Sequence, residues 1–169
     1  MDSTHSIPNH DPGRYEYYPL ETSAGHALLP HDHELVVNKV SGKVTQVDWE
    51  RRRFVADSSF TDEELPLIMT LLNDWPSHVP YEKMLVVVSD ETPEQIAQRV
   101  GEARTTNTLA AVLTPVRTIL TTCNERMHLF SIDIAAVYET GYLLIPLSKR
   151  KVTEVQSATE QGKQEESAS

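Results

Sequence analysis

Residues 129–145 read LFSIDIAAVYETGYLLI, and this stretch decides the fold class. Its β-branched and aromatic residues predict strands over 129–132, 134–137 and 142–145. Glu139-Thr140-Gly141 is typical of a tight turn between the last two of these strands. The sequence therefore predicts that the core of the chain ends in a β-hairpin.

Helical patterns precede this hairpin. Thr61 and Glu64 have the spacing of a capping box, and the apolar residues up to Leu72 recur on one helical face. Pro66 is compatible with this helix because proline is tolerated in a first turn. The next segment, YEKMLVVV at 81–88, fits either a helix or a buried strand.

Two more helices are predicted between these segments and the hairpin. Pro93 begins the first, which covers 94–100 and is expected to stop at Gly101. The second is a longer apolar helix over about 108–123. Pro115 removes a backbone donor within it and predicts a kink.

Before the helices, three short β-prone runs at 34–39, 44–49 and 52–55 are separated by turn-forming residues. They predict a small antiparallel sheet. The order of strands, helices and terminal hairpin predicts an α+β fold.

Composition divides the 169 residues into three parts. Residues 1–33 hold four of the ten prolines and five of the seven histidines, without an alternating apolar pattern, and are expected to form a flexible arm. Residues 34–148 carry almost all the core-forming side chains and are expected to form one domain. Residues 149–169 nearly lack large apolar side chains and are expected to be a disordered polar tail.

The charge balance limits the classes of partner. Lys and Arg total 15 against 25 Asp and Glu, for a net charge of -10, which argues against nucleic-acid binding over the whole surface but allows a local basic patch. The single cysteine, Cys123, permits no internal disulfide and fits a reducing compartment. No apolar run approaches the ~20 residues of a membrane span, and the first residues do not resemble a signal peptide. We expect a cytoplasmic protein without a membrane partner.

Four stretches of the core, 60–72, 76–85, 107–120 and 134–144, match the motifs of one known family. The first, FTDEELPLIMTLL, is similar to that family's first helix, and the second starts with its proline-x-x-valine turn. The last ends in glycine-tyrosine before a hydrophobic strand, as the family's wing does. Over roughly residues 34–147 the chain resembles the OmpR/PhoB-type winged-helix DNA-binding domain, without the phosphoacceptor (receiver) domain that often precedes it.

This resemblance implies an N-terminal antiparallel sheet, a three-helix core and a C-terminal β-hairpin wing. It also implies a transcriptional regulator that binds double-stranded DNA, with a recognition helix at about 107–123 in the major groove and a wing at 134–145 beside it. A homodimer is compatible with the resemblance. The residues that it places at the DNA are Asn107, Thr108, Ala111, Thr114, Arg117, Tyr138 and Thr140.

The chain departs from the family in its charges. Positions that are often arginine in the recognition helix are Asn107, Thr114 and Pro115 here, and Arg117 alone keeps the charge. In the wing the corresponding positions are Ala135, Tyr138 and Leu143. Each lost phosphate contact weakens DNA binding. The alternative is therefore a protein-interaction module that has lost DNA readout and docks on RNA polymerase or another regulator.

Other basic residues occur as clusters at 51–53 and 149–151, which either contact phosphates from the flank or form solvated edges. His26, His31, Asp32 and His33 are types that bind metal, but their spacing defines no site. Cys123 is interpreted as a structural thiol. No paired catalytic carboxylates, nucleophile elbow, phosphate-binding loop or dinucleotide fingerprint is found, so neither an enzyme nor a cofactor is expected.

Overall fold

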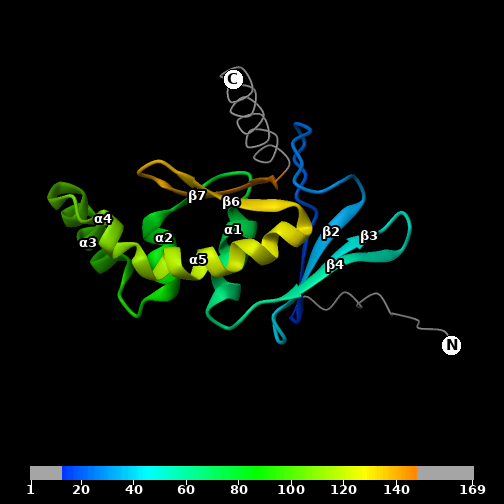
Figure 1. The fold of residues 1–169 in the computed structure, drawn as a ribbon, viewed down its shortest axis with the longest axis horizontal. Helices are drawn as coiled ribbons and strands as arrows, with labels where there is room; N and C mark the ends of the chain where they lie inside the picture. The colour runs from blue at the N-terminus through cyan, green and yellow to red at the C-terminus, as the bar shows by residue number, and fades with distance from the viewer. Residues whose placement is uncertain (1–12, 148–169) are drawn as a thin grey trace, which may run out of the picture.

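An antiparallel sheet of four strands forms one end of the molecule in the computed structural model, which describes residues 13–147 (Figure 1). The strands lie side by side in chain order: β1 (Tyr15–Tyr18), β2 (His33–Asn38), β3 (Lys43–Asp48) and β4 (Arg53–Ser59). Leu35 and Val37 of β2 are fully buried against the helices. The antiparallel sheet predicted from the short β-prone runs is confirmed, with β1 as an additional strand.

The folded part begins earlier than predicted. The segment expected to be an arm, 1–33, contains β1, which pairs along its length with β2. Four side chains from this segment enter the hydrophobic core: Tyr18, Leu20, Leu28 and Leu29. Local periodicity did not identify these four side chains, because they form no repeating pattern and become buried only in the core that the whole fold assembles. Residues 1–12 and the predicted tail at 149–169 lie outside the described residues.

The first helix, α1 (Glu64–Asp74), begins as its sequence predicts. The backbone N–H of Thr61 donates to the Glu64 carboxylate at 2.9 Å, and the N–H of Glu64 donates to Thr61 Oγ1 at 3.3 Å. These reciprocal bonds satisfy donors that a helix start leaves free. The ambiguous segment at 81–88 forms a second helix, α2 (Tyr81–Val88), which buries Met84 and Leu85.

The helix that starts at Pro93 does not stop at Gly101. Helix α3 (Pro93–Thr106) continues through it to Asn107, which takes a left-handed conformation with φ 58°. Buried Ile96, Val100 and Ala103 lie on both sides of the glycine. Their packing outweighs the cost of about 1 kcal/mol for glycine inside a helix.

The long helix predicted over 108–123 is two helices. A short α4 (Leu109–Val112) is followed by α5 (Thr114–Met127), with Leu113 between them. Pro115 lies in the first turn of α5, where the missing N–H is not needed, so the proline starts a helix rather than kinking one. Helix α5 then runs past Cys123 to Met127.

A second, smaller sheet completes the fold. Strands β5 (Val79–Pro80), β7 (Gly141–Pro146) and β6 (Ile132–Val137) lie in the order β5-β7-β6. The predicted strand at 129–132 is wrong, because Leu129 and Phe130 belong to a 3-10 turn, η1 (His128–Phe130), that buries Phe130. The hairpin predicted over 134–145 is confirmed as β6 and β7.

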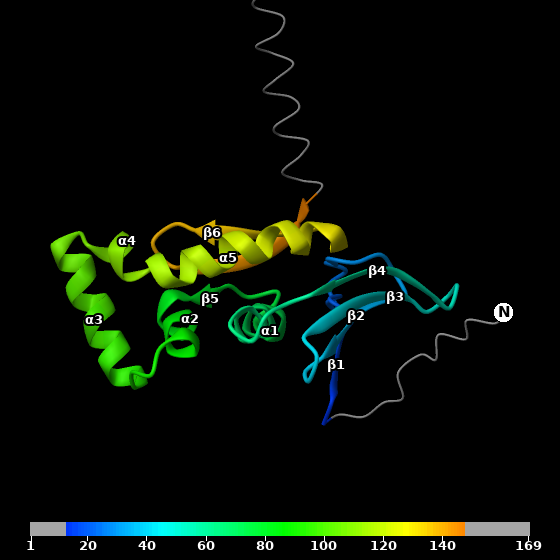
Figure 2. The same ribbon diagram turned by 60° about the horizontal axis from the view of Figure 1, so that its bottom comes forward.

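Helices and sheets share one core. Figures 1 and 2 show α5 running along the β6–β7 hairpin, with α3 and α4 at the end remote from the four-stranded sheet. The fold is thus α+β, with an antiparallel four-stranded sheet, a group of helices and a small C-terminal sheet. Over residues 13–147, no helix combines the length and apolar character needed to cross a bilayer.

Candidate nucleic-acid interface

Helix α5 has one buried face and one exposed face. Val116, Leu120, Cys123 and Met127 are buried in the core. Residues three and four apart share a helical face, so the opposite side carries a separate set of exposed residues. That set is Thr114, Thr118, Thr121, Thr122 and Glu125, and Pro115 and Arg117 are exposed as well. Most of one side of α5 is therefore accessible to a partner.

The turn between β6 and β7 projects beside α5 and is held firmly. Within it, the Thr140 N–H donates to the Val137 carbonyl at 3.0 Å and Thr140 Oγ1 donates to the Tyr138 carbonyl at 3.0 Å. From α2, the Tyr81 N–H donates to the Thr140 carbonyl at 3.0 Å. From α3, Arg104 Nη2 donates to the Glu139 carbonyl at 3.2 Å. Each backbone carbonyl from residue 137 to 140 thus accepts a hydrogen bond.

This turn presents an unusual side chain. Tyr138 is 86% exposed, the highest value among the large apolar side chains of residues 13–147. Hydrogen bonds fix its backbone, and the phenol lies outward in solvent. Glu139 takes a left-handed conformation with φ 55° next to it.

A groove of about 920 Å³ separates α5 from the hairpin. Leu109 and Ala110 line it near α4, and Tyr81 comes from α2. Helix α5 contributes Arg117, Leu120, Thr121, Asn124 and Glu125, followed by His128. The hairpin contributes Ile134, Ala136, Tyr138, Glu139 and Tyr142. The groove is therefore open, partly aromatic and partly charged.

A buried acid, Asp133, contacts two of the groove-lining residues, Asn124 and His128. Asp133 on β6 is fully buried, accepts a hydrogen bond from Asn124 Nδ2 at 2.9 Å and lies 2.9 Å from His128 Nε2. Asn124 Oδ1 in turn accepts the N–H of Ile134 at 2.9 Å. These bonds fix the end of α5 against the first residues of the hairpin.

The floor of the groove contains two tyrosine rings. Tyr81 and Tyr142 meet edge to face with their centroids 5.5 Å apart. Burial raises the pKa of Tyr142, with Tyr81 acting in the same direction and the Arg117 guanidinium opposing them. The charge of Arg117 is thus felt at the tyrosine hydroxyl, which stays protonated at neutral pH.

The structure brings only some of the predicted DNA-contact residues together. Arg117 and Tyr138 line the groove, and Thr114 and Thr140 lie in the adjoining first turn of α5 and hairpin turn. Asn107 and Thr108 instead form the junction of α3 and α4, where Thr106 and Thr108 hydroxyls are 2.9 Å apart. Ala111 lies on α4 and is exposed, but it does not line the groove.

Sequence reasoning missed several residues of the site. Arg104, Asn124 and His128 position or line the groove, yet none of them follows a local motif. Of the groove-lining residues, Arg117 is the only arginine or lysine, and the same set contains the carboxylates of Glu125 and Glu139. The electrostatic potential of this face is therefore weak.

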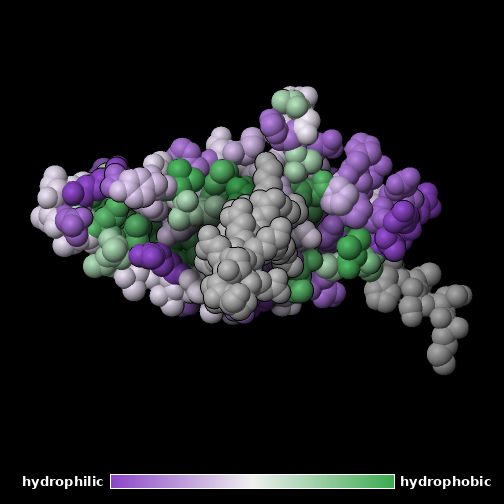
Figure 3. All heavy atoms as spheres, turned by 45° about the horizontal axis from the view of Figure 1, so that its top comes forward, coloured by the Kyte–Doolittle hydropathy of each residue, from purple (hydrophilic) through white to green (hydrophobic). Residues whose placement is uncertain are grey.

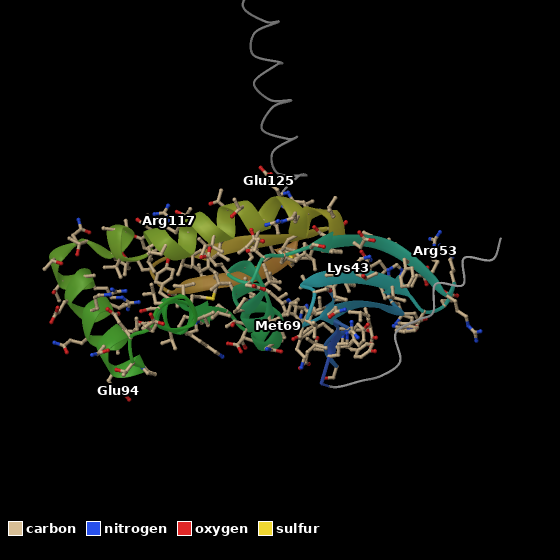
Figure 4. The ribbon with its side chains drawn as sticks, turned by 90° about the horizontal axis from the view of Figure 1, so that it is seen from below. Lys43, Arg53, Met69, Glu94, Arg117 and Glu125 are labelled. Carbon is tan, nitrogen blue, oxygen red and sulfur yellow. The ribbon has the colours of Figure 1, made fainter. Side chains whose placement is uncertain are left out.

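The basic cluster at 51–53 does not add charge to the groove. Figure 4 shows Arg53 and Lys43 on the four-stranded sheet and Arg117 on α5 toward the opposite end of the molecule. Arg53 Nε lies 3.4 Å from Asp48, and Lys43 lies 3.7 Å from Asp57. The second cluster, 149–151, lies outside the described residues.

His31 and His33 each lie close to carboxylates. His31 lies 3.7 Å from Glu21 and 3.6 Å from Asp32, and His33 lies 3.6 Å from Asp48. In the part of the chain from 13 to 147, no three His, Cys, Asp or Glu side chains are placed to hold one metal ion. The structure gives the metal hypothesis no geometry.

Cys123 lies on the buried face of α5. Burial raises the pKa of its thiol to about 12, with Glu64 adding to the effect and Arg126 opposing it. We expect the native protein to resist alkylation by iodoacetamide at pH 8, since the thiolate is the reactive form. In urea the thiol should react at the rate of a free cysteine. Mass spectrometry of samples quenched over time measures both rates, and rapid modification of the folded protein would contradict the assignment.

The surface around the site is mixed in polarity. In Figure 3, outside the grey atoms, apolar residues on the visible face form small patches separated by polar ones.

Comparison of the chain with models of protein families, with curated proteins and with solved structures gives no match.

Proposed function

We propose that this protein is a DNA-binding transcriptional regulator of the winged-helix type, with α5 in the major groove and the β6–β7 hairpin beside it. The observation that carries the proposal is the exposed face of α5 next to a rigid, projecting hairpin turn. The order of elements also supports the proposal. Strand β5 follows α1 in the chain and pairs with β7, one of the two strands of the hairpin.

The dimensions of α5 suit this role. An α-helix is about 10–12 Å across with its side chains, and the major groove is about 12 Å wide. The 14 residues of α5 extend about 21 Å, so its first turns can enter the major groove of DNA while Asp133 and Asn124 hold the other end of the helix. In such a pose the hairpin turn lies over the flanking backbone.

The charges define what kind of binding is expected. Non-specific affinity for DNA depends on the number of phosphates that lysine and arginine neutralise. With Arg117 as the only such residue of the groove, the electrostatic contribution is small, and the logarithm of affinity should fall by only about 1 unit per tenfold rise in salt. Binding would depend mainly on contacts with base edges.

The test is fluorescence anisotropy with mixed-sequence duplex DNA at low and at physiological salt. Arg117→Ala is expected to weaken binding about tenfold, because it removes the one cation that faces the groove. Arg51→Ala, an exposed arginine at the far end of the molecule, is the matched control and should leave affinity within about twofold. Failure of the wild-type protein to bind at low salt, or equal losses for both variants, would argue against the proposal.

A second function is favoured by a different observation. Glu125 and Glu139 repel phosphates, whereas Tyr138 is the kind of exposed aromatic residue that serves as an anchor at protein interfaces. A protein-docking module that contacts RNA polymerase or another regulator is therefore the alternative. If wild-type protein binds no DNA, capture of a partner that Tyr138→Ala abolishes would support this alternative.

A further inference from the structure

The exposed side of α5 carries threonines whose hydroxyl protons are all engaged. Thr114 Oγ1 donates to the Ala110 carbonyl at 3.1 Å, Thr118 Oγ1 to Thr114 at 2.9 Å and Thr121 Oγ1 to Arg117 at 2.8 Å. Thr122 Oγ1 donates to the Ile119 carbonyl at 2.8 Å. Each bond is made to a carbonyl three or four residues earlier in the chain, which for Thr114 lies on α4 and for the others on α5. Such bonds to the preceding turn are common for threonine in helices.

This pattern determines what the face offers to a partner. A threonine hydroxyl has one proton and two lone pairs, so a hydroxyl that donates to its own helix can only accept from outside. The γ-methyl group remains as an apolar contact. Apart from Arg117 at its edge, the exposed side of the first turns of α5 therefore presents acceptors and methyl groups rather than donors.

Base pairs differ in how well they match such a face. In the major groove an A·T pair displays the N6 donor of adenine and the C5-methyl of thymine. A G·C pair displays the N4 donor of cytosine and the O6 and N7 acceptors of guanine, and an A·T pair likewise has two acceptors, N7 of adenine and O4 of thymine. Both pairs thus offer one donor to a threonine acceptor, and the thymine methyl is the complementary group that only the A·T pair adds.

We infer that α5 recognises A·T pairs through thymine methyl groups and adenine amino groups, with Thr114 and Thr118 as the specificity-determining residues. This inference rests on the proposed function and specifies its target. The two threonines are four residues apart and thus about 6 Å apart along the helix, which spans about two base-pair steps of 3.4 Å. Glu125 lies about 10 Å further along α5, away from the entering turns.

The experiment compares three duplexes of equal length by anisotropy at low salt: alternating A·T, alternating G·C, and the A·T duplex with deoxyuridine in place of thymidine. The uracil duplex lacks only the C5-methyl groups and keeps the same minor groove. We expect wild-type protein to bind the A·T duplex about tenfold more tightly than the G·C duplex, and the uracil duplex about fivefold more weakly than the thymine one.

Two double variants separate the methyl from the hydroxyl. The double variant Thr114→Ser with Thr118→Ser removes both methyl groups and should bind thymine and uracil duplexes alike, at about the wild-type affinity for uracil. The double variant Thr114→Val with Thr118→Val keeps a methyl at each position and should still distinguish thymine from uracil. Thr70→Ser on α1 is the matched control, because Thr70 is partly exposed and donates to the Pro66 carbonyl at 2.7 Å in the same way. Circular dichroism checks that each variant is folded.

The outcomes separate the two levels of the proposal. Equal affinity for all three duplexes, or a double serine variant that still prefers thymine, would overturn the inference and leave DNA binding standing. Absence of binding to every duplex at low salt would overturn the proposed function itself.

Discussion

Replacing Gly141 by alanine is expected to destabilise the protein by about 3 kcal/mol or more and to separate β5 from β7. A Cβ at this position would lie 1.9 Å from the Val79 carbonyl oxygen and 3.0 Å from the Pro80 Cα. Both are backbone atoms of the neighbouring strand, so no side-chain rotation relieves the clash. Urea denaturation followed by tryptophan fluorescence and circular dichroism measures the loss.

The same substitution at another glycine provides the control. Gly101 lies inside α3, and a Cβ there would meet no atom within 4 Å. Gly101→Ala should therefore stabilise the protein by about 0.5–1 kcal/mol, since alanine is the better helix former. A Gly141→Ala protein with wild-type stability would show that β5 and β7 do not approach as closely as the structure indicates.

Replacing Arg126 by alanine is expected to cost about 3–5 kcal/mol, because it leaves the carboxylate of Glu64 buried without its cation. The Arg126 guanidinium pairs with Glu64, whose side chain is only 10% exposed. It also lies 5.1 Å from the centroid of the Phe60 ring and donates to the Ser59 carbonyl at 3.4 Å. The measurement is again the free energy of unfolding in urea at pH 7.

The double variant Arg126→Ala with Glu64→Gln removes both charges and should recover a large part of this loss. Arg117→Ala, at an exposed arginine on the same helix, should change the stability by less than about 0.5 kcal/mol. An Arg126→Ala variant as stable as wild type would mean that Glu64 is solvated or protonated in the folded protein.

Arg126 also connects three elements of the fold. It joins α5 to the start of α1 through Glu64 and to the end of β4 through Ser59. Because Glu64 accepts the N–H of Thr61 as well, one carboxylate serves both the helix cap and the ion pair. The orientation of α5, and with it the exposed threonine face, depends on this contact.

Short-range features of the fold were predictable from the sequence. The capping box of Thr61 and Glu64 involves residues three apart, and the turn at Glu139-Thr140-Gly141 joins strands that are neighbours in the chain. Their signals are local because the partners are local. Arg117 and Tyr138 were likewise identified before the structure placed them at one groove.

Features that depend on distant partners were not predictable. Strand β1 has only four residues and gains its hydrogen bonds from β2, about twenty residues away. Helix α3 passes through Gly101 because Ile96, Val100 and Ala103 are buried by elements that their own segment does not contain. Local propensity is a weak preference that such packing overrides.

By itself, the sequence determined the α+β class, the start of α1 and the C-terminal hairpin, since these follow from patterns within a few residues. Only the tertiary structure decided where the folded part begins, how the helix around Pro115 divides, and which side chains share the groove. Asn124 and Tyr142 line that groove from two different elements, and Arg104 on a third element donates to the Glu139 carbonyl beside it. Their contacts depend on how those elements pack, and no spacing along the chain encodes them.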